Sequence, residues 1–191
     1  MATVRSNDKT ALMVVDVQVG VMQECANAAQ TIANVARTVE RARAAQVPVI
    51  WVQHESDELK RDSDAWQWVP ALVPAAGEAR VYKQFNSSFE QTNTDELLAQ
   101  AGVSHIVLAG AQSNWCIRAT AYGALERGYD LTLVKDAHTT SDLDLGNGTR
   151  IDAATIVRDL NVTMKWLQYP GRRNAVAAAE EVVFGGTAGN G

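Results

Sequence analysis

The sequence predicts an α/β protein, a three-layer α/β/α sandwich built on a mainly parallel sheet. Short apolar runs alternate with longer amphipathic segments along the chain. The runs at residues 10–15 and 106–109 are apolar throughout, which is typical of strands covered on both faces. The 191 residues contain no internal repeat and no shift of composition. We therefore expect a single domain over residues 1–191, with a glycine-rich C-terminal tail at 185–191.

Six apolar runs have the length and composition of buried strands. Pro48 is tolerated because it lies near the start of its run, and Gly110 bounds another run. The last run is the least regular, because Thr163 and Lys165 interrupt it. The predicted strands are residues 10–16, 47–53, 79–83, 106–109, 130–135 and 162–167.

Helical signals fill most of the intervals between these runs. Apolar residues recur at helical spacing in the second interval, for example Ile32, Val35 and Val39. Thr94 is a predicted N-cap, and Gly128 follows a segment rich in alanine. The predicted helices are residues 27–46, 94–102, 117–128 and 149–160. The predicted connections are residues 143–148 and the long segment 55–77, which either covers a site or forms an interface.

Bulk composition limits the classes of partner. The net charge of −5 and the isoelectric point near 5.2 argue against nucleic acid or an anionic membrane as the main partner. No apolar run is long enough to span a bilayer, and residues 1–10 lack the apolar core of a signal peptide. Cys25 and Cys116 lie in different contexts, which does not suggest a disulfide. A cytoplasmic location is the expectation.

Cys116 occupies the most informative position in the chain. It follows a buried strand and a turn with capping residues, so it falls in the first turn of the next helix. The positive end of a helix dipole favours a thiolate there. The alternative is a structural role, because most free cysteines behave as small buried apolar side chains.

Two further chemical groups are expected beside Cys116. Asp16 and Lys83 each end a predicted parallel strand, so all three residues belong at one carboxyl edge of the sheet. A carboxylate can accept the thiol proton, and an ammonium stabilises the resulting thiolate. Taken singly, Asp16 could equally be a turn residue and Lys83 a surface charge. Their shared edge favours a catalytic set.

At this point the sequence resembles the isochorismatase-like cysteine hydrolases. The resemblance covers about residues 10–168, which is the expected core of the domain. It implies a six-stranded sheet with the strand order 3-2-1-4-5-6, and it also implies a homo-oligomer, a dimer or a tetramer. The segments that carry it are Ala11–Gln18, Val81–Phe89, Gly110–Cys116, Ala119–Ala124 and Gly128–Ala137.

The same resemblance implies roles for individual residues. Asp16, Lys83 and Cys116 correspond to a catalytic triad. A cis peptide bond is expected between Ala111 and Gln112, with the backbone N–H groups of Gln112 and Cys116 forming an oxyanion hole. The implied chemistry is acyl transfer through a thioester. Seven candidate residues for the substrate-binding pocket are Gln18, Val21, Trp66, Trp68, Phe89, Trp115 and Tyr122.

Some positions of this sequence differ from the pattern of known family members, and these differences limit the reactions that the resemblance implies. Nicotinamidases of the family carry a metal site with two or more histidines, whereas His54 is followed by no histidine before His105. We therefore expect no metal and no cofactor. Isochorismatases that cleave a vinyl ether lack the nucleophilic cysteine, so Cys116 argues against that reaction. Val21 stands where the family usually has an aromatic residue.

The resulting prediction is a cysteine amidohydrolase acting on a small non-peptide amide. A carboxamide, a ureide or a cyclic amide of the streptothricin type all remain open, as does a nicotinamidase-like amidase. The alternative from another class is a catalytically silent binding or oligomeric scaffold with the same fold. A redox thiol protein lacks support because there is no Cys-x-x-Cys motif, and residues 110–115 lack the glycine pattern of a dinucleotide site.

Overall fold

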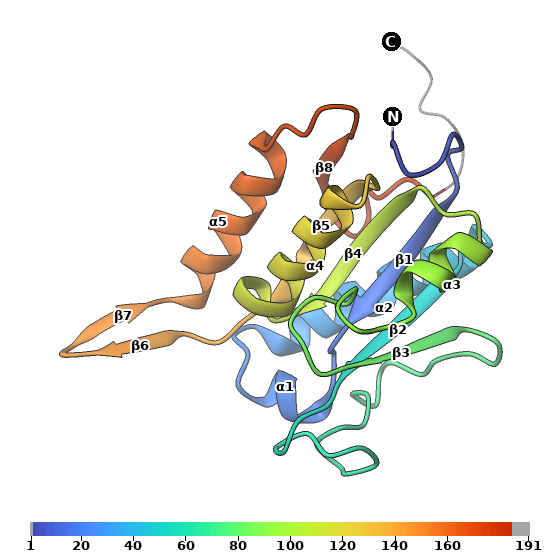
Figure 1. Ribbon diagram of the computed structural model, residues 1–191. Coiled ribbons are helices and arrows are strands. Elements are labelled where there is room, and N and C mark those ends of the chain that lie inside the picture. The colour runs from blue at the N-terminus through green and yellow to red at the C-terminus, as the bar shows by residue number, and fades with distance from the viewer. Residues whose placement is uncertain (1, 185–191) are drawn as a thin grey trace.

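A six-stranded parallel sheet lies between two layers of helices in the computed structural model, which describes residues 2–184 (Figure 1). The predicted glycine-rich tail at 185–191 lies outside the described residues. The strand order is β3-β2-β1-β4-β5-β8, and every neighbouring pair is parallel. The six strands are β1 (Thr10–Val15), β2 (Val49–His54), β3 (Ala79–Lys83), β4 (His105–Ala111), β5 (Asp130–Thr139) and β8 (Asn174–Ala177).

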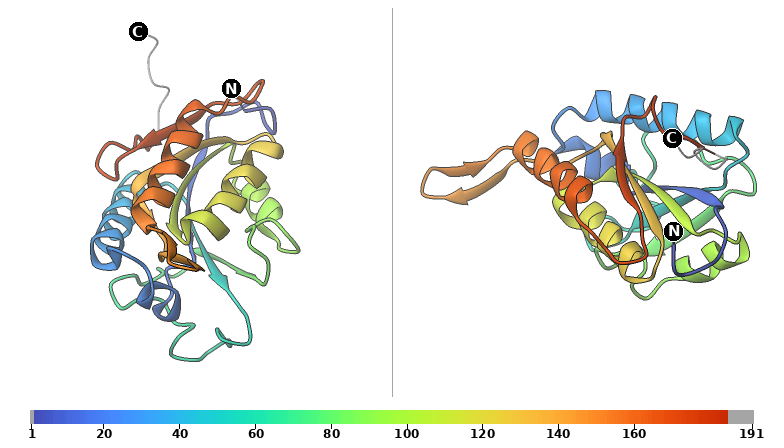
Figure 2. Two further views of the ribbon diagram at one scale, coloured as in Figure 1. Left: turned by 90° about the vertical axis from the view of Figure 1, so that its left-hand side faces the viewer. Right: turned by 90° about the horizontal axis from the view of Figure 1, so that it is seen from above.

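Each face of the sheet buries its own apolar core. In β1, Met13 and Val15 face one core, while Leu12 and Val14 face the other, as the two-residue repeat of a strand requires. The first core packs against α3 (Thr94–Gln100), α4 (Arg118–Glu126) and α5 (Ala153–Trp166). The second core packs against α1 (Val19–Gln23) and α2 (Ala28–Ala44), so the predicted three-layer sandwich is confirmed (Figure 2).

The prediction for the last strand is wrong. Residues 162–167 do not form a strand, because all but the last belong to α5. Ile156, Leu160 and Met164 are buried at intervals of four residues, which is the spacing of a helix face. The strand at the β5 edge is β8 instead, which pairs with β5 from Leu131 to Val134.

A β-hairpin replaces the predicted loop and the predicted start of the last helix. The strands β6 (Leu143–Gly146) and β7 (Thr149–Ile151) pair antiparallel and project from the body of the molecule (Figures 1 and 2). Asn147 and Gly148 both have positive φ, 52° and 76°, as a tight two-residue hairpin turn requires. Helix α5 begins only after this arm, and Asp152 caps it by accepting a hydrogen bond from the backbone N–H of Thr155.

A close approach between β1 and β4 fixes the edge of the sheet at which Asp16 and Cys116 emerge. Gly110 has a φ of 131°, and a Cβ atom there would lie 1.9 Å from the carbonyl oxygen of Val15. Only glycine fits this position. Asp16 directly follows Val15, and Gln112 directly follows β4. Because β1 and β4 are neighbouring parallel strands, these two segments leave the sheet side by side. No helix within residues 2–184 is long and apolar enough to cross a membrane.

Candidate active site

The structure brings Asp16, Lys83 and Cys116 together at the carboxyl edge of the sheet. Asp16 follows β1, Lys83 ends β3, and Cys116 lies in a π-helical turn, Ser113–Ile117, that joins β4 to α4. The Lys83 Nζ lies 2.6 Å from Asp16 Oδ2 and donates a hydrogen bond to Cys116 Sγ at 3.2 Å. All three side chains are buried. Three residues that the sequence places near the ends of three strands thus meet in space, with Lys83 in contact with the other two.

Lys83 is the hub of this cluster. Besides Asp16 and Cys116, its Nζ contacts the Phe85 carbonyl and His54 Nδ1, both at 3.2 Å. Burial alone would lower the pKa of Lys83, but the charge of Asp16 beside it outweighs this effect and the pKa is raised. Lys83 is therefore an ammonium at neutral pH and cannot act as the base.

The Cys116 thiol is protonated in the resting site. Burial, followed by the charge of Asp16, raises the pKa of Cys116 to about 12, and Lys83 only partly offsets this. The position at a helix terminus predicts a lowered thiol pKa from the sequence. The burial that raises the pKa instead arises only from the folded structure. Asp16 Oδ1 is buried and has no hydrogen-bond partner among residues 2–184. This oxygen is therefore available to accept a proton.

Two residues beside this cluster, His54 and Asn86, were not predicted from the sequence as site residues. Burial and then the charge of Lys83 lower the pKa of His54, so its imidazole is neutral and can accept from the ammonium. The Cys116 thiol lies 3.8 Å from Asn86 Oδ1, its possible acceptor. His54 ends β2, and this strand end is the signal that could have identified it.

Asp16, His54 and Cys116 also form the one described group whose ligand atoms could hold a metal, lying within 4.8 Å of one another. The Lys83 ammonium contacts all three of these residues. The Lys83 ammonium therefore already supplies a positive charge to the same three side chains, and a metal ion bound by them would have to displace this ammonium. This arrangement favours an ammonium-centred site.

A hydrogen bond from Ser113 to the buried His138 holds the turn that carries Cys116. The peptide bond between Ala111 and Gln112 is cis, and Ser113 then begins the turn. His138 Nδ1 lies 2.8 Å from the Ser113 hydroxyl, and its Nε2 lies 3.0 Å from Asn161 Oδ1. Asn161 donates its amide to the Lys135 carbonyl, so its oxygen accepts from His138 Nε2–H and leaves Nδ1 to accept from Ser113. His138 thus links the nucleophile's turn to α5.

We expect this buried histidine to make stability depend on pH. Burial lowers the pKa of His138 to about 4, against an ordinary 6.5. Between pH 6.5 and 4, His138 is therefore protonated in the unfolded chain but neutral in the folded chain. Lowering the pH through this range favours the unfolded chain, so the free energy of unfolding falls by about 3 kcal/mol in all. Urea unfolding at pH 7.5 and 4.5 measures this loss. His138→Gln should show a smaller loss, and an equal loss in both proteins would contradict the assignment, since His54 and His105 are common to both.

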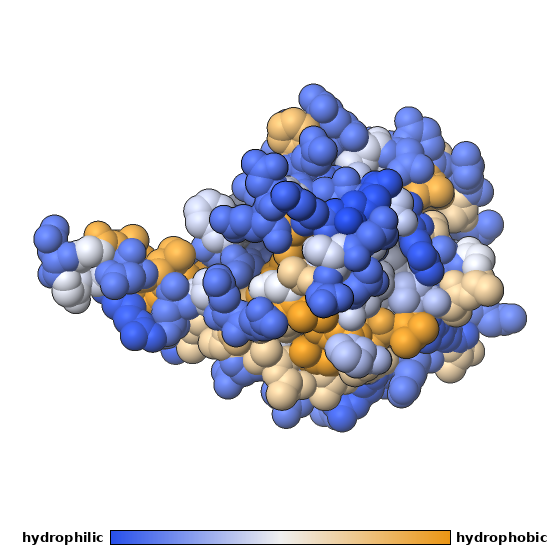
Figure 3. Space-filling model, turned by 90° about the horizontal axis from the view of Figure 1, so that it is seen from below, coloured by the Kyte–Doolittle hydropathy of each residue, from blue (hydrophilic) through white to orange (hydrophobic). Residues whose placement is uncertain are grey.

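A cavity of about 420 Å³ opens onto this cluster. Asp16, His54 and Cys116 form its floor, and residues of the 55–77 segment form one wall, so that segment borders the site. Hydrophilic side chains cover most of the surface on this side of the molecule (Figure 3). The remaining lining residues are Gly20, Val21, Glu24, Ser56, Glu58, Leu59, Ala65, Asn86, Gln112 and Trp115.

Val21 and Trp115 are the two predicted pocket residues that line this cavity. The other five pack elsewhere because each already has a partner. Gln18 donates to the carbonyls of His54 and Trp66 and so ties the 55–77 segment to β2. The four aromatic side chains pack as follows: Trp66 on Tyr82, Trp68 on Trp51, Phe89 on Tyr129, and Tyr122 against the core beneath α4.

A larger hollow, of about 710 Å³, lies between α2, β5 and α5. His138 contributes to its lining, but Asp16, Lys83 and Cys116 do not. Its volume exceeds that of the cavity above Cys116, yet neither of the chain's two cysteines lines it. Chemistry therefore assigns the smaller cavity as the candidate active site.

Comparison with known proteins identifies the family. The family model described as the isochorismatase domain matches residues 10–156. The chain belongs to the isochorismatase family. Among solved structures, an isochorismatase from Pseudomonas putida superposes with a TM-score of 0.80 at 27% identity, covering 90% of this chain and 88% of that one. The resemblance inferred from the sequence is thereby confirmed.

Curated relatives in the isochorismatase family differ in what their names describe. A streptothricin hydrolase from Streptomyces noursei is 33% identical over 144 residues, covering 72% of this chain and 57% of that protein. A probable inactive nicotinamidase from Arabidopsis thaliana is 30% identical over 173 residues, covering 72% and 88%. The match thus spans less than two thirds of the hydrolase. The chain is thus similar both to a protein named as a hydrolase and to one named as a probable inactive nicotinamidase.

Proposed function

We propose that this protein is a cysteine amidohydrolase that cleaves the C–N bond of a small non-peptide amide through a thioester on Cys116. One observation carries the proposal. The Lys83 ammonium contacts both Asp16 and the Cys116 sulfur, while the second oxygen of Asp16 has no partner within residues 2–184. A nucleophile, a base and a positive field thus meet at the floor of a cavity.

Acylation begins with proton transfer. Asp16 takes the proton from Cys116 as the sulfur attacks the amide carbonyl carbon, and Lys83 stabilises the developing thiolate. The backbone N–H groups of Gln112 and Cys116 are the proposed donors to the tetrahedral oxyanion. Each such donor contributes about 3 kcal/mol to the transition state. Asp16 then returns the proton to the leaving nitrogen, the C–N bond breaks, and a thioester and a free amine or ammonia result.

Deacylation repeats these roles with water. Asp16 accepts a proton from the attacking water, and the same oxyanion donors hold the second tetrahedral intermediate. The C–S bond breaks, the acid product leaves, and Cys116 regains its proton. Asp16, Lys83 and Cys116, which Lys83 holds together in the resting site, thus serve in both half-reactions.

A silent scaffold remains the rival, and the probable inactive relative gives it substance. What favours an enzyme is the composition of the buried cluster. Burying an ion pair costs several kcal/mol of desolvation per charge, and a binding scaffold has no need of it beneath a thiol. The predicted homo-oligomer stays a prediction, with the exposed Leu145 on the projecting arm as a candidate contact.

Ammonia or amine release tests the proposal directly. The panel consists of carboxamides, ureides and lactams, each incubated with the parent protein and with Cys116→Ala. Release by the parent alone would support the proposal and narrow the substrate class. Release that is equal in both proteins would overturn the role of Cys116.

A further inference from the structure

The open rim of the cavity above Cys116 carries charge of one sign. Glu24 follows α1, and Glu58 lies in the 55–77 segment, so two separate parts of the chain place a carboxylate there. Both residues are exposed, and neither forms an ion pair within residues 2–184. Among the described residues, no arginine or lysine lines this cavity.

The floor of the cavity does not balance this charge. Asp16 and Lys83 form an ion pair and cancel each other, while His54 and Cys116 are neutral. The two glutamates therefore set the sign of the field that a ligand meets on entry. Asp16 also lines the cavity, and its buried Oδ1 has no hydrogen-bond partner in the described chain.

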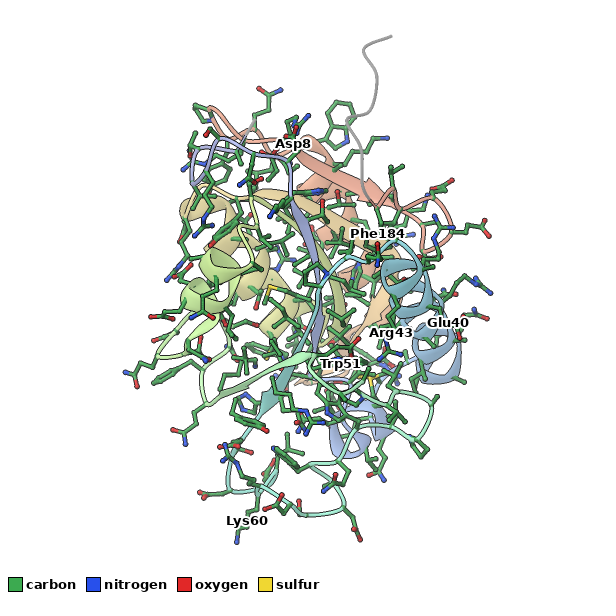
Figure 4. The ribbon with its side chains drawn as sticks, turned by 90° about the vertical axis from the view of Figure 1, so that its right-hand side faces the viewer. Asp8, Glu40, Arg43, Trp51, Lys60 and Phe184 are labelled. Carbon is green, nitrogen blue, oxygen red and sulfur yellow. The ribbon has the colours of Figure 1, made fainter. Side chains whose placement is uncertain are left out.

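Basic residues close by in the sequence are directed elsewhere. Arg61 forms an ion pair with Glu55 at 2.5 Å and lies 4.1 Å from the centre of the Tyr82 ring. Lys60 lies at the outer end of the 55–77 segment, away from the body of the molecule (Figure 4). Neither residue lines the cavity. Within residues 2–184, the rim thus offers no cationic partner for a substrate carboxylate.

Trp115 supplies the matching apolar surface. It directly precedes the nucleophile, lines the cavity, and leaves 49% of its side chain exposed. The face of an indole ring attracts ammonium and guanidinium groups. A cation entering beside Trp115 would meet an aromatic face and two carboxylates around one opening.

We infer that the substrate is a cationic amide, in which an ammonium or guanidinium group lies a few bonds from the scissile carbonyl. Glu24, Glu58 and Trp115 bind the positive group at the rim, while the carbonyl reaches Cys116 at the floor. An anionic amide would place its carboxylate against two glutamates and be disfavoured. This inference rests on the proposed function and selects among the amides that it leaves open.

Matched amides test the inference. Each set shares one chain length and differs only in its terminal group: 3-aminopropanamide, butanamide and succinamate form the shortest set, and longer homologues extend the series up to 6-aminohexanamide. At some length, kcat/KM should be highest for the ammonium member and roughly tenfold or more above the carboxylate member. Added salt should reduce this preference, because screening weakens exposed charges. Equal or reversed preference at every length would overturn the inference while leaving the amidohydrolase in place.

Variants connect the preference to named residues. Glu24→Gln and Glu58→Gln should each lower kcat/KM for the ammonium amide by about three- to fivefold, as expected for exposed charges, and should lower it by less for the matched neutral amide. Asp57→Asn is the matched control, because it removes an exposed charge from the same segment outside the cavity. An equal loss in the control would show that overall charge, not the rim, is responsible.

Thiol modification provides a readout without turnover. Cationic aminoethyl, neutral methyl and anionic sulfonatoethyl methanethiosulfonates are compared at Cys116 by peptide mass spectrometry, with each rate normalised to that of a small free thiol. The cationic reagent should react fastest, and Glu24→Gln with Glu58→Gln should remove its advantage. This selectivity without amide turnover would refute the proposed function alone. Turnover without selectivity would refute the inference alone.

Discussion

Replacing Cys116 by alanine is expected to lower kcat/KM for amide hydrolysis by at least about 1,000-fold, because loss of a covalent nucleophile leaves only the binding contributions. The fold should survive, since the change removes one buried sulfur and leaves the Asp16–Lys83 ion pair intact. The expected cost in the free energy of unfolding is about 1 kcal/mol. Steady-state ammonia release and urea unfolding measure the two effects separately.

Cys25→Ser is the matched control for this experiment. Cys25 is the chain's other cysteine, also buried, and it donates to the Val21 carbonyl at 3.2 Å, a bond that serine can keep. The Cys25 sulfur also accepts from the Gln112 side-chain amide at 3.7 Å, a contact that a serine hydroxyl can likewise accept, so kcat/KM should stay within about twofold of the parent. Comparable losses in both variants would point to general disruption and contradict a nucleophilic Cys116.

Asp16→Asn is expected to separate turnover from thiol ionisation. Without the base, kcat/KM should fall by about 100- to 10,000-fold. The charge of Asp16 raises the pKa of Cys116, whereas the charge of Lys83 lowers it, so the variant's thiol pKa should be lower than the parent's. Alkylation by iodoacetamide should therefore begin at a lower pH even as hydrolysis is lost. Asparagine also tolerates the left-handed backbone at this position, where φ is 54°.

Asp130→Asn is a control with the same chemical change. Asp130 is a buried carboxylate at the opposite end of the sheet, where it pairs with Arg173 at 2.9 Å. It should leave the alkylation profile of Cys116 unchanged. If Asp16→Asn kept normal turnover, or moved the thiol pKa upward, Asp16 could not be the base described above.

Much of this site could be predicted because parallel strands expose their ends at one edge. In the sequence, Asp16 and Lys83 each stand at the end of an apolar run, and Gly110 stands near the end of a third run, that of β4. Strand order then decides which ends are neighbours. The predicted order differs from the observed order only in the last strand, so the catalytic cluster was unaffected by that error.

What the sequence could not supply depends on tertiary contacts. Residues 162–167 contain β-branched and aromatic side chains, yet burial of Leu160 and Met164 continues the helix through most of them. Trp66 and Trp68 are predicted to line the pocket, but in the folded chain their rings pack on Tyr82 and Trp51. Glu58 is one of several charged residues at the start of the 55–77 segment, and only the folded segment shows that it borders the cavity.

Mass spectrometry of the protein quenched in acid during turnover tests the central claim most directly. Cleavage after Lys83 and Arg118 releases the peptide Gln84–Arg118, in which Cys116 is the single cysteine. The account predicts that this peptide gains the mass of the substrate's acyl group, that the gain disappears once the substrate is consumed, and that Cys116→Ala shows neither adduct nor turnover. An acyl group found on another residue, or turnover that persists in Cys116→Ala, would contradict it.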